Sequence, residues 1–178
     1  MAAPTRRATE ARYARLRNIA LQKAEEILVP TVAPVSISLR LVTPDAIHAF
    51  SSTWEQHPDR RTEWPWAQMH RDYRRNEPDR FEVAIWSDVT LCGLAIGKLK
   101  TDYCCGDFVE GSPLAQHPLK EKVIPSVLTA LEVYAILLEK REIRLIRPAP
   151  ELIPRYEKQH FTLVSPKGQK QYCVKVVS

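Results

Sequence analysis

Apolar residues that recur at three- and four-residue steps mark a first amphipathic helix, predicted from Thr5 to about Leu28. Its apolar positions are Tyr13, Leu16, Ala20, Ala24 and Ile27. Thr5 or Thr9 can cap its start, and Pro30 stands just past its predicted end.

The same spacing predicts further helices along the chain. One begins at Pro44 with Thr43 as its N-cap, and it turns Ile47, Phe50 and Trp54 inward. The others are predicted at Trp64–Arg75, at Ile124–Lys140 and, as a short helix, at Pro150–Gln159.

Strand-like patterns fill most of the intervals between these helices. Alternation of apolar and polar residues predicts a half-buried strand at Val35–Val42, and two β-rich runs, Phe81–Trp86 and Leu91–Leu99, predict an antiparallel hairpin. Further strands are predicted at Gly106–Gly111, as a strand or a bulged edge, at Ile143–Ile146 and at Gln171–Val177. The order β-α-α-β-β-β-α-β-α-β implies a mixed α/β sheet flanked by helices.

Length and composition limit the protein to a few classes. A chain of 178 residues with 44% hydrophobic and 26% charged residues is typical of one globular domain. No apolar run approaches the roughly 20 residues needed to cross a bilayer, and no secretory signal is recognisable, so we expect a soluble cytoplasmic protein without membrane contact. The four cysteines lack the CxxC spacing of zinc sites, which predicts reduced thiols and no metal centre.

The formal net charge of +5 favours acidic partners, such as nucleic acid, a phosphorylated cofactor or an acidic protein. Arginines decorate the first helix, which is either a basic arm for such a partner or a solvated face whose other side packs on the domain. The stretch Arg60–Arg75 mixes arginines with aromatic residues. It fits a helix with core tryptophans, an acceptor-binding wall or a nucleic-acid surface.

The segment from Pro118 to Phe161 resembles the cofactor-binding half of the GCN5-related N-acetyltransferases (GNAT). In that family a glycine-rich loop leads into a long helix and holds the pyrophosphate of acetyl-coenzyme A. Here Lys120-Glu121-Lys122-Val123-Ile124-Pro125-Ser126 occupies the position of that loop without its glycines. Residues 143–161 resemble the family's later segment, with Tyr156 on its tyrosine, Phe161 on its phenylalanine and His160 in place of its glycine.

The resemblance implies a GNAT-like fold, a mostly antiparallel central sheet flanked by helices. It covers about Val35 to Val177, so we divide the chain into an N-terminal basic helix and linker, 1–34, and a single GNAT-like acyltransferase domain, 35–178. It also implies cofactor contacts from Lys120, Lys122, Val123, Ile124 and Ser126, through charge and through the free amides of a helix N-terminus. Pro125 cannot donate an N–H group, and Val123 is expected to place a branched side chain where the phosphate lies.

The catalytic roles implied by the family fall on three residues. Tyr156 would protonate the departing thiolate of coenzyme A, unless it is simply a core aromatic. For the general base, the family often uses a Glu or Asp on its fourth strand or a water chain, and Asp107 and Glu110 are the local candidates.

The function predicted from the resemblance is transfer of an acetyl group from acetyl-coenzyme A to an amine acceptor, a small molecule or a protein. The alternative is a catalytically inactive GNAT-fold protein that binds a protein or nucleic-acid partner, for example through the basic first helix. A homodimer is an assembly that the sequence allows.

Overall fold

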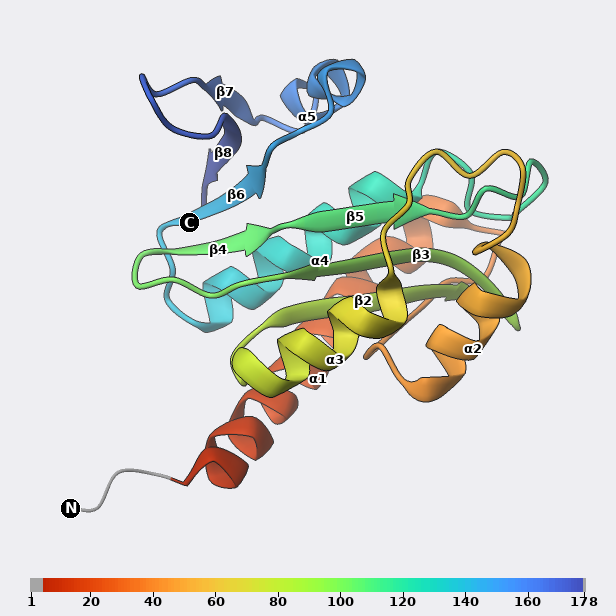
Figure 1. Cartoon of the computed structure of the whole chain (residues 1–178), viewed down its shortest axis with the longest axis horizontal. Helices are drawn as coiled ribbons and strands as arrows, with labels where there is room; N and C mark the ends of the chain where they lie inside the picture. The colour runs from red at the N-terminus through yellow and green to blue at the C-terminus, as the bar shows by residue number, and fades with distance from the viewer. Residues whose placement is uncertain (1–4, 178) are drawn as a thin grey trace.

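The computed structural model describes residues 5–177, in which two four-stranded sheets lie edge to edge (Figure 1). The first sheet has the order β1-β2-β3-β5, and its pairs are all antiparallel. The second has the order β4-β6-β8-β7 and contains one parallel pair, β4 with β6. The strands are β1 (Ser38–Arg40), β2 (Phe81–Ser87), β3 (Thr90–Gly97), β4 (Tyr103–Gly106), β5 (Phe108–Gly111), β6 (Glu142–Ile146), β7 (Thr162–Val164) and β8 (Tyr172–Val176).

Helices cover both faces of the first sheet. Helices α2 and α3 lie on one face, and α1 and α4 lie on the other (Figure 1). The helices are α1 (Arg6–Val32), α2 (Pro44–Thr53), α3 (Trp66–Asn76), α4 (Val123–Leu137), the 3-10 turn η1 (Pro150–Leu152) and α5 (Ile153–Glu157). This arrangement confirms the predicted mixed α/β fold with mostly antiparallel sheets flanked by helices.

The two sheets meet where β3 runs on past Gly97 beside β4. The Cys105 N–H donates to Lys98 O (2.8 Å), and the Asp107 N–H donates to Ile96 O (3.0 Å). The backbones come so close that a Cβ on Gly97 would lie 1.7 Å from Cys105 O, so only glycine fits there. Strands β4 and β5 are therefore two halves of one irregular strand that breaks at Asp107.

Helix α1 packs into the same core as α4. Its buried residues Ala20, Leu21, Ala24 and Leu28 join one apolar cluster with side chains of β2 and α4. The second cluster lies between the first sheet and α2 with α3, around Phe50, Trp54, Trp66 and Leu94. The division of the chain into 1–34 and 35–178 remains a prediction. Helix α1, which precedes residue 34, shares an apolar core with the elements that follow.

A buried charge network also attaches α1 to the sheet. The Arg17 side chain, 1% exposed, contacts Glu10 (2.6 Å) and Glu82 (3.7 Å) and donates to the carbonyl oxygens of Pro78 and Arg80. Arg80 bridges Glu10 (3.0 Å) and Glu82 (2.9 Å), and His70 Nε2 lies 3.2 Å from Glu82. One arginine of the predicted basic face is thus a structural anchor rather than a surface charge.

Most predicted elements are present, with shifted ends. Thr5 caps α1 by accepting from the Ala8 N–H, but the helix continues through Pro30 to Val32 instead of ending before the proline. The first strand is shorter than predicted, since β2 pairs only with Ser38–Arg40. Strand β7, paired with β8, has no counterpart among the predicted elements.

Candidate active site

A fork between neighbouring strands is the central feature of the site. Strand β4 pairs with β6 in parallel up to Gly106 and Leu145. Beyond that point β5 pairs with β3, and β6 continues with β8. The two strands therefore part, and β5 has one unpaired edge.

The polar groups on that edge follow from the hydrogen-bond register. The Ser112 N–H donates to Cys92 O (2.9 Å), so alternate residues of β5 bond to β3. Val109 and Gly111 occupy the other positions, and they turn their N–H and C=O groups toward the fork. An extended ligand can pair with such an edge as an added strand does.

The N-terminus of α4 lies against the first sheet beside this edge. Val123 is buried, and its methyl groups fill the space above Gly93 and Gly111, which pair across β3 and β5. A Cβ on Gly93 would lie 2.6 Å from Val123 Cγ1. The branched side chain of Val123 therefore points into the core rather than toward a ligand at the helix end, contrary to the expectation from sequence.

The first turn of α4 has fewer donors than a glycine-rich loop supplies. The N–H groups of Val123 and Ile124 have no acceptor within the helix, as at any helix start, and Pro125 has no N–H. Ser126 is already engaged, since its N–H (3.0 Å) and its hydroxyl (2.7 Å) both donate to Lys122 O. Of the predicted cofactor contacts, the two amides and the two exposed lysines thus keep donors for a ligand, whereas Ser126 has none left.

Both lysines of this loop are exposed. The Lys120 ammonium donates to Ala115 O at 3.3 Å, and the Lys122 backbone forms the N-cap of α4. Between them, Glu121 has φ of 66°, a left-handed conformation that glycine adopts more readily. The loop therefore keeps a glycine-like turn and a positive charge at the positive end of the helix dipole.

Asp107 lies at the break between β4 and β5. Its Oδ2 accepts a hydrogen bond from the Tyr73 hydroxyl of α3 (2.7 Å), and Oδ1 has no partner among residues 5–177. Burial raises the pKa of Asp107, although the Tyr73 hydrogen bond and the charges of Lys98 and Lys100 oppose the shift. A half-buried carboxylate with a raised pKa and a free oxygen can accept a proton.

Glu110, the other predicted base, has quite different surroundings. Its carboxylate is 5% exposed and binds Arg60 through both oxygens (2.7 and 3.2 Å). It also accepts from Trp66 Nε1 at 2.5 Å, and Arg60 in turn donates to Trp64 O at 2.8 Å. This arrangement holds the loop between α2 and α3 against β5, which is a positioning role.

Tyr156 lies on α5, packed against Phe161 with ring centroids 6.3 Å apart. The residue is 4% exposed, yet its hydroxyl makes no hydrogen bond within residues 5–177. Burial raises its pKa to about 12. His160, in the place of the family's glycine, has φ of 67° and so keeps the left-handed turn that ends this segment.

The structure adds Tyr73, Arg60 and Trp66 to the site. They come from the arginine- and aromatic-rich stretch, for which core packing and an acceptor wall were two of the three predicted readings. Trp66 is fully buried, as core packing predicts, and Tyr73 and Trp64 pack edge-on against Phe108 of β5. The acceptor wall remains a prediction. Nothing in the local sequence marks which carboxylate each residue meets, because the partners are 34 to 50 positions away.

Known proteins similar to this chain are found by structure and not by sequence. No protein-family model matches the chain, and no curated protein matches its sequence. Among solved structures, the chain is similar to Ard1 from Thermoplasma volcanium, with a TM-score of 0.58 and 13% identity over 81% of this chain and 99% of that one.

Two other similar structures contain a cofactor. One is the N-acetyltransferase PseH from Campylobacter jejuni in complex with acetyl coenzyme A, with a TM-score of 0.56 and 11% identity over 80% of this chain and 100% of that one. The other is the PaiA N-acetyltransferase from Thermoplasma acidophilum in complex with coenzyme A, with a TM-score of 0.52 and 16% identity over 79% of this chain and 99% of that one. The chain thus has the GNAT acetyltransferase fold, and the resemblance seen in the sequence is confirmed at the level of the fold.

The described part of the chain bears on two further features, a metal site and a membrane-spanning helix. In residues 5–177, no group of three or more histidine, cysteine or acidic side chains could hold a metal ion. No helix within the same range is long and apolar enough to span a membrane. Cytoplasmic location and a homodimer remain predictions.

Proposed function

We propose that this protein is an acetyl-coenzyme A-dependent N-acetyltransferase whose acceptor is an amine. The observation that carries the proposal is the strand fork: β5 turns unpaired backbone groups toward it, and the N-terminus of α4 lies beside it. The cofactor would supply an acetyl thioester, whose carbonyl carbon the amine attacks.

The residues around the fork suit such a ligand in part. The amides of Val123 and Ile124, with the ammonium groups of Lys120 and Lys122, would hold the pyrophosphate at the helix end. The outward N–H and C=O groups of Val109 and Gly111 would hydrogen-bond the extended arm. Val123 does not obstruct this arrangement, because its side chain is buried beneath the helix.

Two proton transfers complete the proposed reaction. Asp107 would take the proton that the amine loses as its nitrogen bonds to the acetyl carbon, either directly or through a water molecule. Tyr156 would give its hydroxyl proton to the sulfur as the carbon–sulfur bond breaks. Its hydroxyl is protonated at neutral pH, as in any tyrosine, and it has no competing partner in the described chain.

Calorimetric titration with acetyl-coenzyme A tests the cofactor part. We expect micromolar binding, weakened about tenfold in the double variant Lys120→Ala, Lys122→Ala, because two exposed charges near a pyrophosphate each contribute a modest amount. Lys23→Ala, an exposed lysine on α1, is the matched control and should bind like the parent protein. Absence of binding at millimolar cofactor would refute the proposal and favour the non-catalytic interaction protein.

Tyr156→Phe tests the acid once binding is established. We expect turnover to fall about 100-fold, within the usual range for a general acid, with little change in cofactor affinity. The readout is thiol release from acetyl-coenzyme A with the best acceptor from a panel of amines. Unchanged turnover would return Tyr156 to the role of a core aromatic.

A further inference from the structure

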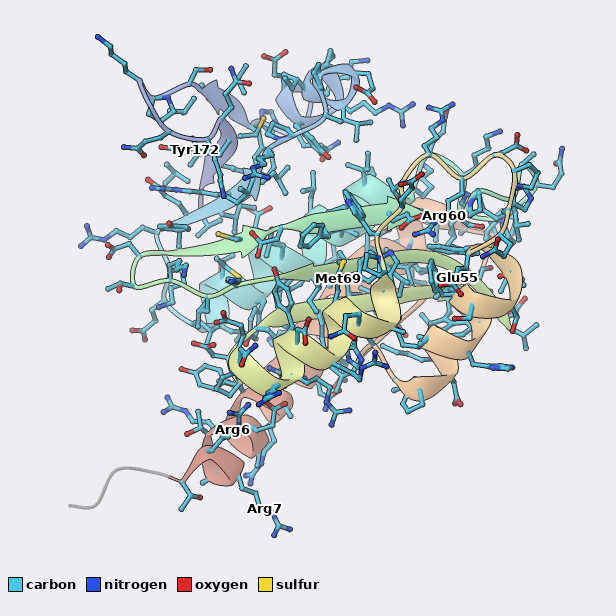
Figure 2. All side chains as sticks on the ribbon, in the orientation of Figure 1. Arg6, Arg7, Glu55, Arg60, Met69 and Tyr172 are labelled. Atoms are coloured by element: carbon cyan, nitrogen blue, oxygen red, sulfur yellow. The ribbon has the colours of Figure 1, made fainter. Side chains whose placement is uncertain are left out.

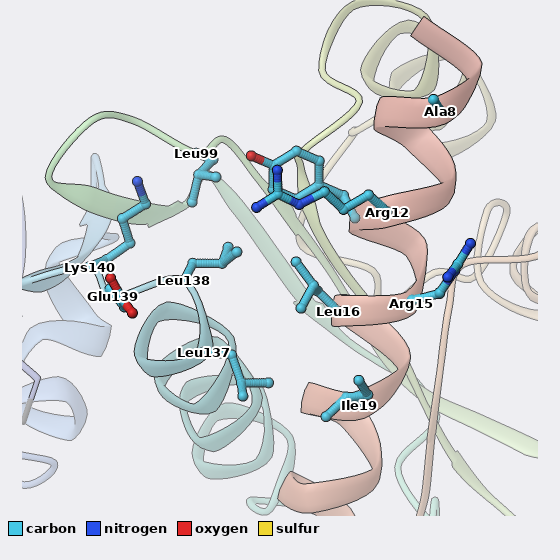
Figure 3. Close-up of a pocket in the computed structure, with 11 residues that line it drawn as sticks. Ala8, Arg12, Arg15, Leu16, Ile19, Leu99, Leu137, Leu138, Glu139 and Lys140 are labelled. Atoms are coloured by element: carbon cyan, nitrogen blue, oxygen red, sulfur yellow. The ribbon is translucent and has the colours of Figure 1, made fainter. Parts of the chain in front are cut away.

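A hollow of about 600 Å³ lies between the N-terminal half of α1 and the C-terminal end of α4 (Figure 3). Its walls come from α1, from the residues that follow α4, and from Leu99 in the connection between β3 and β4. Helix α4 has 15 residues and so is about 22 Å long, which places this hollow a full helix length from the α4 N-terminus. It is therefore separate from the proposed acetyl-transfer site.

The floor of the hollow is apolar. Leu16 and Ile19 of α1 face Leu137 and Leu138 across it (Figure 3). Ile19 is 43% exposed, which leaves a large apolar side chain in contact with water. Such a surface gains free energy when an apolar group covers it.

The wall formed by α1 is set rigidly in place. Ala8, Arg12, Leu16 and Ile19 follow one another at three- and four-residue steps, so they share one face of the helix. Arg17, on another face, fixes the helix to Glu82 through the buried charge network. The hollow is thus preformed, which lowers the cost of ordering on binding.

Positive charge surrounds the mouth. Arg12 extends from α1 across the opening, and Lys140 stands on the opposite side, where its ammonium donates to Thr101 O (2.9 Å) (Figure 3). Within residues 5–177, Arg12 has no ion-pair or hydrogen-bond partner and only stacks beside Tyr13 (5.7 Å). Glu139 is the one carboxylate of the lining against Arg12, Arg15 and Lys140.

Charged residues on the neighbouring turns of α1 add to the positive charge near the hollow. Arg6 and Arg7 precede the hollow on α1, and both are exposed (Figure 2). Glu10, the only acidic residue among the first 24, has both its oxygens bound to Arg17 and Arg80. Glu139 of the lining therefore remains as a carboxylate that can compete with an anion for Arg12, whereas Glu10 does not.

We propose that this hollow binds a free single-chain amphiphilic acid, with its apolar tail over Leu16, Ile19, Leu137 and Leu138 and its carboxylate or phosphate head at Arg12. Its volume lies within the roughly 300–1,000 Å³ usual for small-molecule sites. An apolar floor with a few polar groups at one side selects a ligand that has both parts. This inference does not depend on acetyl transfer.

The test is calorimetric titration of the full chain with octanoate, below the concentration at which octanoate forms micelles. We expect saturable binding to one site, and no detectable binding of acetate, which has the head without the tail. We also expect 1-octanol, which has the tail without the charge, to bind about fivefold more weakly, the size of one solvent-exposed charge interaction.

Matched variants locate the site. Arg12→Ala should weaken octanoate binding about fivefold, whereas Arg7→Ala, an exposed arginine outside the hollow, should not change it. Ile19→Glu should weaken binding more than about tenfold, because it places a like charge on the apolar floor. Ile27→Glu is the control, since Ile27 is also exposed on α1, at 53% against 43% for Ile19, but lies outside the lining.

Three results would overturn the proposal. They are the absence of saturable octanoate binding, equal affinity for 1-octanol and octanoate, and loss of binding in Arg7→Ala or Ile27→Glu to the same extent as in their partners. Sedimentation with anionic phosphatidylglycerol vesicles distinguishes a free amphiphile from a lipid bilayer, because a bilayer also offers apolar tails with anionic head groups. Arg12-dependent binding to vesicles without binding of octanoate would assign the surface to a lipid bilayer and overturn the free ligand.

Discussion

Two clusters of polar side chains, one around Arg17 and one around Asp107, differ in how completely their carboxylates are paired. In the network around Arg17, all four oxygens of Glu10 and Glu82 face a basic nitrogen. At the strand fork, Asp107 has one hydroxyl partner and one free oxygen in the described chain. The carboxylates of the first centre are fully paired and stabilise the fold, whereas the carboxylate of the second keeps hydrogen-bonding capacity for a ligand.

The direction of the pKa shifts follows this difference. Burial alone would raise the pKa of Glu82, but the hydrogen bond from His70 and the charges of Arg80 and Arg17 hold it below its usual value. Ionised Glu82 thus contributes stability above its unfolded pKa, and this contribution is lost as pH falls through the folded pKa. Asp107 has a raised pKa, so its contribution to stability is present at low pH and is lost as pH rises.

Arg17→Ala should have the largest effect. It leaves Glu82 and Glu10 short of a buried partner, which costs about 3–5 kcal/mol of unfolding free energy. Denaturant unfolding measures the loss. Arg15→Ala, an exposed arginine on the same helix, should stay within about 0.5 kcal/mol of the parent, and an equal loss in both would contradict the anchoring role.

Asp107→Asn should separate function from stability at the other centre. Turnover is expected to fall about 100-fold with loss of the proposed base. The melting temperature should not fall, because the ionised carboxylate is costly where it lies. Asp72→Asn, at an exposed position of α3, is the control for both measurements, and full turnover in Asp107→Asn would place the base elsewhere.

Glu110→Gln tests whether Glu110 has a structural role, like Glu82, or acts as the base, as proposed for Asp107. Because it leaves the buried Arg60 without its counter-charge, we expect a loss of about 2 kcal/mol in unfolding free energy. The Michaelis constant for the acceptor should rise as the loop between α2 and α3 loosens. The acidic limb of the pH–rate profile should stay, and its disappearance would make Glu110 the base.

Tyr73→Phe should give the smallest change. The Tyr73 hydrogen bond lowers the pKa of Asp107, so its removal raises that pKa further. The acidic limb of the pH–rate profile should move to higher pH, while turnover on the plateau changes little. A profile that does not move would show that Asp107 is not the group that titrates.

Local sequence predicted the helices and most strands because their periodicity and caps are encoded within a few residues. Thr5, Pro44 and the β-rich runs of β2 and β3 mark their elements without help from distant residues. Strand β7 was missed because its three residues are held mainly by pairing with β8. The position of Tyr156 was visible only through the family resemblance.

The sequence by itself determined the order of the helices and of most strands, and the absence of glycine from the α4 loop. Tertiary structure alone decided that Val123 faces the core, that Glu110 is bound by Arg60 and Trp66, and that Arg17 is buried. The physical reason is that burial and pairing depend on residues far apart in the chain. A carboxylate becomes an anchor or a base according to which side chains the fold brings to it.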